Sequence, residues 1–147
     1  LPRAVFSSGV FAEGWAVYIE TAMLEKGFGE GDPGFEIQRW KWLMRAVANA
    51  IIDQKLHKGL MSDEELVNFL MEQAFQERTE AEAKLTRAKL SYGQLATYFV
   101  GYEEMMDLRE DYRDEVGDDF NMSDYHVEVV SHGAPPPRLL RRLVLED

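Results

Sequence analysis

The chain has 147 residues, of which 46% are hydrophobic and 12% aromatic, and this suits one folded domain with its own core. Its formal net charge is -11, and an acidic surface repels nucleic acid and anionic membrane, so we expect neither as a partner. The absence of cysteine excludes disulfides, thiolate zinc sites and thiol nucleophiles. The sequence shows no membrane-spanning run and no targeting segment.

The first two predicted helices flank a turn rich in glycine. Residues 11–26 and 35–57 predict helices, and residues 27–34, which include Asp32-Pro33, predict the turn. In the second helix, apolar residues recur at steps of three and four, which indicates one apolar face. These residues are Ile37, Trp40, Met44, Val47, Ala48 and Ile51.

Capping signals predict the start of two further helices. Ser62-Asp63-Glu64-Glu65 has the pattern of a capping box, so we expect a helix that runs to about Phe75. A polar stretch over residues 76–80 is expected to separate it from a helical piece at 81–90. Residues 91–94 show the same capping pattern, and we expect them to open a long helix that ends near residue 112 or 113.

Short elements are predicted for the last part of the chain. Residues 117–119 predict a turn, and Ser123 is expected to cap a short helix to about Val130. A final helix at 138–145 follows the proline run, with Pro137 in its first turn. No convincing strand remains, so the sequence predicts an all-α fold of about six to seven packed helices in a single helical domain, residues 1–147.

The three histidines, His57, His126 and His132, are the first candidates for chemistry. None lies in an H-E-x-x-H arrangement, which places two imidazoles on one helical face. His57 follows Asp53 by four residues, so the two side chains are expected to lie on the same face of the helix. Two interpretations of His57 stay open: a helix-end histidine that the helix dipole favours, and a catalytic or ligating group.

Glu13 lies on a helical face with Ala16, Val17 and Glu20. A carboxylate on a small or apolar face needs a partner, because burying it alone is unfavourable. Three interpretations stay open: a structural ion pair, a solvent-exposed carboxylate and a metal ligand. No nucleophile elbow and no phosphate-binding glycine loop is present in the sequence.

Tyr98 and Arg109 lie on the same predicted long helix, and Tyr92 lies near its start. Tyrosines at such positions commonly pack helix interfaces, and the alternative is a hydroxyl that donates to an oxyanion.

Four segments, in order along the chain, resemble the DUF885 family. Residues 11–20 resemble its F-x-E-G-W-A-x-Y-x-E stretch, and residues 48–57 resemble its segment with an aspartate and a helix-end histidine. Residues 91–101 are similar to its P-x-Q-x-x-x-Y-x-x-G stretch, with Ser91-Tyr92 where a proline is common. Residues 125–136 are similar to its F-H-D-x-x-L-x-x-G-x-x-P ending, with Val127 in place of the aspartate.

The resemblance implies the C-terminal helical part of a larger zinc-peptidase-like hydrolase of the gluzincin kind, with a peptide-like substrate. In that family a motif resembling H-E-x-x-P-G-H lies N-terminal to the E-G-W-A helix, and this chain lacks it. Glu13 matches a metal ligand, so zinc is expected in the complete protein, whereas this chain alone is expected neither to bind it tightly nor to be active.

The resemblance also implies roles for four other residues of the complete protein. Tyr98 would donate to the oxyanion, and His126 would take part in catalysis. His57 and Arg109 would line the cleft and contact the substrate.

The alternative is a helical interaction or oligomerisation module without catalysis. The sequence begins at Leu1 rather than at a methionine, so we expect it to be cut from a longer protein. Such a piece exposes an apolar face, with Trp40, Trp42 and Met44 as candidate contacts. A homo-oligomer, or association through this truncation face, is therefore expected under both hypotheses.

Overall fold

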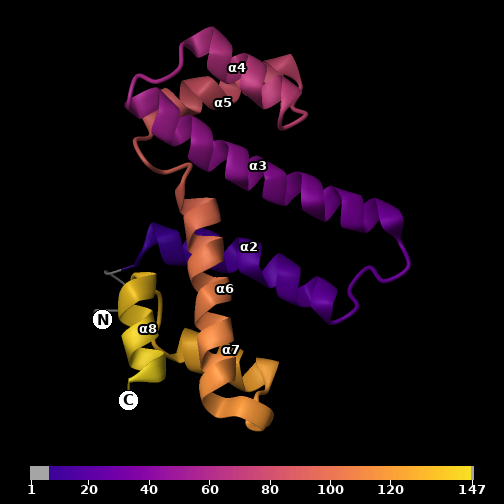
Figure 1. Ribbon diagram of the computed structural model, residues 1–147, viewed down its shortest axis with the longest axis vertical. Coiled ribbons are helices and arrows are strands. Elements are labelled where there is room, and N and C mark those ends of the chain that lie inside the picture. The colour runs from indigo at the N-terminus through magenta and orange to yellow at the C-terminus, as the bar shows by residue number, and fades with distance from the viewer. Residues whose placement is uncertain (1–6, 147) are drawn as a thin grey trace. The chain divides into compact units, whose positions relative to one another are not determined.

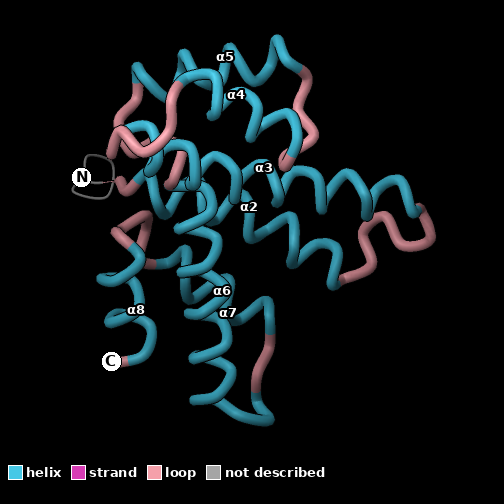
Figure 2. Tube along the Cα trace, turned by 45° about the horizontal axis from the view of Figure 1, so that its top comes forward, coloured by secondary structure: helices cyan, strands magenta, loops and turns pink. Residues whose placement is uncertain are grey.

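The computed structural model describes residues 7–146, and these form helices and loops without any strand (Figure 1, Figure 2). The all-α prediction is confirmed. Within the described range, no helix is both long and apolar enough to cross a membrane. The elements are α2 (Gly9–Glu25), α3 (Pro33–His57), α4 (Asp63–Glu72), α5 (Arg78–Leu90), α6 (Thr97–Val116), the 3₁₀-helix η1 (Gly117–Asp119), α7 (Met122–Ser131) and α8 (Pro137–Leu145).

The predicted capping box at the start of α4 is confirmed. The Glu65 amide donates to Ser62 Oγ over 3.3 Å, and the Ser62 amide donates to Glu65 Oε2 over 2.7 Å. The Ser62 amide, followed by its hydroxyl, holds the pKa of the Glu65 carboxyl below its usual value. Pro137 also occupies the first turn of α8 as predicted.

Two predicted helix caps are wrong. The Ser91 hydroxyl donates back to the carbonyl of Arg87 over 2.8 Å, and Gly93 adopts φ +75°, so residues 91–96 form a turn and α6 begins at Thr97. Asn121, not Ser123, caps α7. Its Oδ1 accepts the amides of Ser123 and Asp124 over 2.8 and 3.2 Å.

The chain divides into two compact units. In unit 1 the described residues are 7–19 and 100–146, and unit 2 comprises residues 20–99. Helices α2 and α6 each contribute residues to both units. The expectation of a single domain over residues 1–147 stays a prediction.

Unit 2 is organised around α3, α4 and α5, which pack against one another (Figure 1). Its interior is aliphatic, and each fully buried leucine or isoleucine contributes roughly 1.5–3 kcal/mol. The Arg45 guanidinium on α3 bonds Glu80 on α5 over 2.8 Å at the edge of this interior. The buried cluster is Ala48, Ile52, Leu66, Val67, Leu70, Ala74, Ala81, Leu85, Ala88 and Leu95.

Unit 1 contains a close crossing of the first part of α2 with α6. A Cβ added to Gly14 would lie 2.2 Å from the carbonyl carbon of Gly101, and one added to Gly101 would lie 2.1 Å from the carbonyl oxygen of Val10. The two backbones therefore meet where no larger residue fits. The fully buried side chains of this unit include Tyr18, Met105, Tyr125, Val129 and Leu140.

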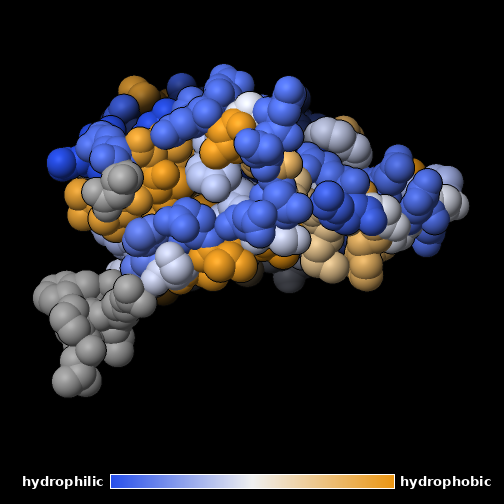
Figure 3. Space-filling model, turned by 90° about the horizontal axis from the view of Figure 1, so that it is seen from below, coloured by the Kyte–Doolittle hydropathy of each residue, from blue (hydrophilic) through white to orange (hydrophobic). Residues whose placement is uncertain are grey.

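Hydrophobic side chains also reach the surface, where they are interspersed with polar and charged ones (Figure 3). The exposed aromatic residues include two in the first half of α3, Trp40, which is 63% exposed, and Trp42, which is 50% exposed.

Candidate functional site

Tyr98 lies in the first turn of α6, and two donors hold its hydroxyl. The Arg87 Nη2 atom donates to Tyr98 Oη over 3.2 Å and to Gln94 Oε1 over 2.7 Å. Gln94 Nε2 lies 3.4 Å from the same hydroxyl oxygen. Because both groups donate to Oη, its own proton remains available to a further acceptor. The role of Tyr98 as an oxyanion donor stays a prediction.

Asp53 fixes the turn that carries Gln94 toward Tyr98. Its side chain is buried, with only 2% of the residue exposed, and its two oxygens accept the backbone amides of Gly93 over 3.2 Å and Ala96 over 3.0 Å. A buried carboxylate is stable where charge-assisted hydrogen bonds replace the lost water. Asp53 of α3 therefore organises residues 91–96, far away in the sequence.

His57 completes this network, and its expected contact with Asp53 is confirmed. Its Nε2 lies 3.2 Å from Asp53 Oδ1 and 3.1 Å from the carbonyl oxygen of Ala88. Both oxygens accept, so we assign a hydrogen to Nε2, which it donates to this pair of acceptors. The ring lies 4.4 Å from that of Tyr92, beside a small pocket of about 50 Å³. Contact of His57 with a substrate stays a prediction.

In unit 1, Tyr18 joins two of the predicted site residues. Its hydroxyl oxygen lies 2.8 Å from His126 Nε2, and the Arg109 guanidinium carbon lies 5.5 Å from the centre of its ring. Trp15 packs edge-on against the His126 ring, with 5.4 Å between centroids. Arg109 is only 4% exposed and lies 3.5 Å from Glu110. The predicted residues His126 and Arg109 therefore belong to one buried aromatic cluster around Tyr18.

Tyr125 lies against the same cluster. It is fully buried, and its hydroxyl donates to the carbonyl of Met105 over 3.3 Å. Burial, reinforced by the neighbouring Tyr18, raises the pKa of the Tyr125 hydroxyl far above its usual value, and Arg109 offsets part of this shift.

Glu13, the predicted metal ligand, is half-buried on α2 in unit 1. Its carboxylate forms no hydrogen bond or ion pair within the part of the chain that the structure describes. Nor do residues 7–146 contain a group of three or more His, Asp or Glu side chains placed to hold a metal ion. The role of Glu13 as a metal ligand stays a prediction.

Sequence reasoning missed three participants of these networks: Arg87, Gln94 as a partner of Tyr98, and Tyr18. Gln94 and Tyr18 both lie in the segments that resemble the family. Each side chain carries a polar group that needs a hydrogen-bond partner when it is buried, and this could have identified them. Arg87 carried no such signal, because a basic residue in the last turn of a helix is ordinary.

These features define an all-helical chain with two hydrogen-bonded networks, one in each unit. The model of the DUF885 family, described as "Bacterial protein of unknown function", matches residues 2–144, and the chain belongs to this family. The family prediction is thereby confirmed.

The solved structures that are similar to the chain include two bacterial proteins. One is a "putative lipoprotein of unknown function" from Shewanella oneidensis, with a TM-score of 0.89 and 41% identity over 95% of this chain and 26% of that one. The other is a "putative lipoprotein" from Colwellia psychrerythraea, with a TM-score of 0.91 and 28% identity over 94% of this chain and 24% of that one. The chain thus spans about a quarter of the length of these proteins. No curated protein matches the sequence.

Proposed function

We propose that this chain is the C-terminal helical part of a larger zinc-dependent hydrolase that acts on peptide-like substrates, with Tyr98 as its oxyanion donor. The observation that carries the proposal is the hydroxyl of Tyr98, which Arg87 and Gln94 hold as an acceptor so that its own proton stays free. The length of the two similar proteins supports the proposal that this chain belongs to a longer protein, because the chain covers only about a quarter of each of them.

The chemistry of Tyr98 follows from this arrangement. Attack on an amide carbonyl places negative charge on the carbonyl oxygen, and a preorganised donor stabilises that charge without first having to reorient. The Arg87 guanidinium, whose carbon lies 5.9 Å from the centre of the Tyr98 ring, adds a positive charge nearby. Arg87 and Gln94 act as positioning residues, and Asp53 sets the turn that carries Gln94.

The other predicted residues take supporting roles in the proposal. His126 is a catalytic group that Tyr18 orients through the 2.8 Å contact, and Arg109 and His57 contact the substrate. Glu13 is one zinc ligand. The remaining ligands and the group that activates water have to come from outside these 147 residues, so the chain alone is expected to be inactive.

The test uses the longer protein that contains this chain, supplied with zinc and a library of peptides. Replacing Tyr98 by Phe is expected to lower kcat roughly 100-fold, the effect of losing one oxyanion donor, with little change in KM or in the folded fraction. The control is Tyr112→Phe, because the Tyr112 ring packs against Phe120 and Tyr125 and has no part in the network around Tyr98, and it should leave kcat unchanged. Equal turnover of both variants would exclude the role of Tyr98. A longer protein that hydrolyses no peptide would exclude the hydrolase itself.

The exposed aromatic residues of α3 support a second candidate, a helical interaction module. Trp40 and Trp42 are at least half exposed. Ile37, which lies closer to the start of the same helix, is 68% exposed. Large exposed apolar groups of this kind mark interaction surfaces. A chain that self-associates in sedimentation equilibrium, and loses association in Trp40→Ser, would favour this module. A strictly monomeric chain would count against it.

A further inference from the structure

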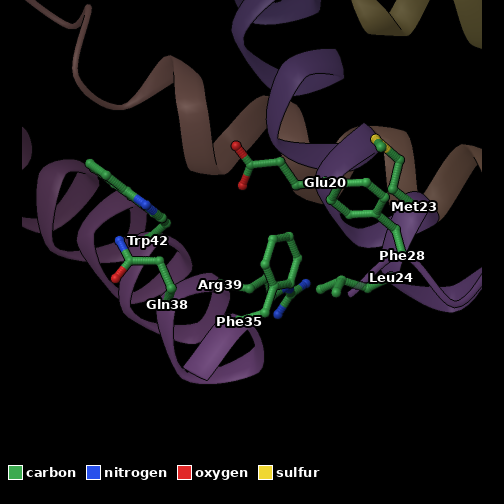
Figure 4. Close-up of a pocket in the computed structure, with 8 residues that line it drawn as sticks. All are labelled: Glu20, Met23, Leu24, Phe28, Phe35, Gln38, Arg39 and Trp42. Carbon is green, nitrogen blue, oxygen red and sulfur yellow. The ribbon is translucent and has the colours of Figure 1, made fainter. Parts of the chain in front are cut away.

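A pocket of about 250 Å³ lies between the end of α2 and the first half of α3, wholly within unit 2 (Figure 4). Three aromatic rings line it, those of Phe28, Phe35 and Trp42. The rings of Phe28 and Phe35 meet edge to face, with 5.2 Å between their centroids. Such aromatic faces carry negative charge density and attract cations.

The pocket also contains one carboxylate, that of Glu20. Figure 4 shows this side chain extending from α2 toward the space between Trp42 and Phe35. It lies at the mouth, still open to solvent, and partial desolvation raises the pKa of its carboxyl above the usual value, while the charge of Arg39 lowers it. Among the residues that the structure describes, Glu20 forms no ion pair.

Arg39 also lines the pocket, but its guanidinium is engaged by other groups. Its Nη2 donates to the hydroxyl of Thr21 over 2.5 Å, and its guanidinium carbon lies 4.4 Å from the centre of the Trp40 ring. It therefore balances the charge of Glu20 only at a distance, which leaves a carboxylate beside aromatic walls without a direct counter-ion.

We propose that this pocket binds a small organic cation, an ammonium group carried on a compact apolar body. The ammonium group pairs with the Glu20 carboxylate, and the apolar body packs against the rings of Phe35 and Trp42. A neutral apolar molecule would leave the carboxylate unpaired, and an anion would be repelled by Glu20 and by a chain of net charge -11. The volume suits one small molecule or one long side chain rather than a folded partner. This site is independent of the proposed hydrolase.

The experiment titrates the isotope-labelled chain with phenethylammonium and follows the indole N–H signal of Trp42 by NMR. Two matched compounds with the same ring, 2-phenylethanol and phenylacetate, test the charge. Phenethylammonium is expected to shift the Trp42 signal in a saturable way and to bind about tenfold more tightly than 2-phenylethanol. Phenylacetate is expected to bind more weakly than both.

Variants then test the carboxylate. Glu20→Gln should weaken binding of phenethylammonium about tenfold, to the level of 2-phenylethanol. Glu36→Gln removes the same charge from an exposed position in the first turn of α3, outside the pocket lining, and should leave binding unchanged. Equal losses of phenethylammonium binding in the two variants would show that the effect comes from the general surface charge, and would overturn the proposal. Equal binding of the cation and the alcohol, tighter binding of phenylacetate, or no saturable shift of Trp42 would overturn it as well.

Discussion

The two units are stabilised by different kinds of contact. The interior of unit 2 is a cluster of aliphatic side chains on α3, α4 and α5, and a single buried carboxylate, Asp53, ties a turn to it. In unit 1 two helices meet backbone to backbone at Gly14 and Gly101, and the large buried groups include two tyrosines whose hydroxyls have partners. Aliphatic interiors tolerate changes that conserve volume, whereas backbone contacts and buried polar groups tolerate almost none. The difference predicts where single substitutions act most strongly.

The largest effect is expected at the helix crossing of unit 1. In Gly101→Ala the new Cβ would lie 2.1 Å from the carbonyl oxygen of Val10, and backbone on both sides leaves no flexible atom to yield. We expect a loss of about 3 kcal/mol in the free energy of unfolding, measured by urea titration. Gly9→Ala is the control, because nothing lies within 4 Å of its added Cβ. Similar stabilities of the two variants would mean that the crossing is looser than the structure shows.

An intermediate effect is expected at the turn of unit 2. Asp53→Asn replaces an acceptor with a donor that faces the amides of Gly93 and Ala96, so we expect a loss of about 2 kcal/mol. Hydrogen exchange of these two amides should accelerate more than that of the core of α4. The control is Asp63→Asn, whose exposed pair with Lys89 contributes at most about 1 kcal/mol. Unchanged protection of Gly93 and Ala96 would refute the role of Asp53.

The smallest effect is expected at the buried hydroxyl of Tyr125 in unit 1. At neutral pH, Tyr125→Phe removes the hydrogen bond to the carbonyl of Met105 and should cost about 1 kcal/mol. The pKa of this hydroxyl is raised in the folded state, so its stabilising effect is fully present below pH 10.0, the usual pKa, and is lost as the pH rises above it.

The variant should therefore lose less stability than the parent chain between neutral and alkaline pH. Thermal unfolding across this range measures the difference. Tyr92→Phe removes an exposed phenol and should keep the parent's dependence on pH. A Tyr125→Phe variant with the parent's alkaline profile would show that Tyr125 does not resist ionisation.

Local signals in the sequence were sufficient for most of the fold. The capping box at Ser62, the proline at the start of α8 and the Asp53–His57 spacing all act over about one helical turn, and each is confirmed. The false capping box at residues 91–94 shows the limit of such signals. The same residue pattern forms a turn there because Asp53, on another helix, accepts the amides of Gly93 and Ala96.

The candidate site was less accessible to sequence reasoning for the same reason. Tyr98 was identified from the sequence as a candidate site residue. Its hydrogen bond with Arg87 was not predicted, because the two residues are brought together by the turn between α5 and α6. The contact of Tyr18 with His126 joins α2 to α7, and no local pattern encodes a pairing over that separation. The metal role of Glu13 stays a prediction, because residues 7–146 contain no group of three or more His, Asp or Glu side chains placed to hold a metal ion.

The meeting of Gly14 with Gly101 also bears on the order of folding. All of residues 20–99 lie between these two glycines in the sequence, so the crossing closes a long loop. Loop closure of this kind carries an entropic penalty that contacts between neighbouring helices avoid, and folding slows as contacts become more distant in sequence. We therefore expect the α4–α5 hairpin to form early in folding and the backbone contact of α2 with α6 at these glycines to form late.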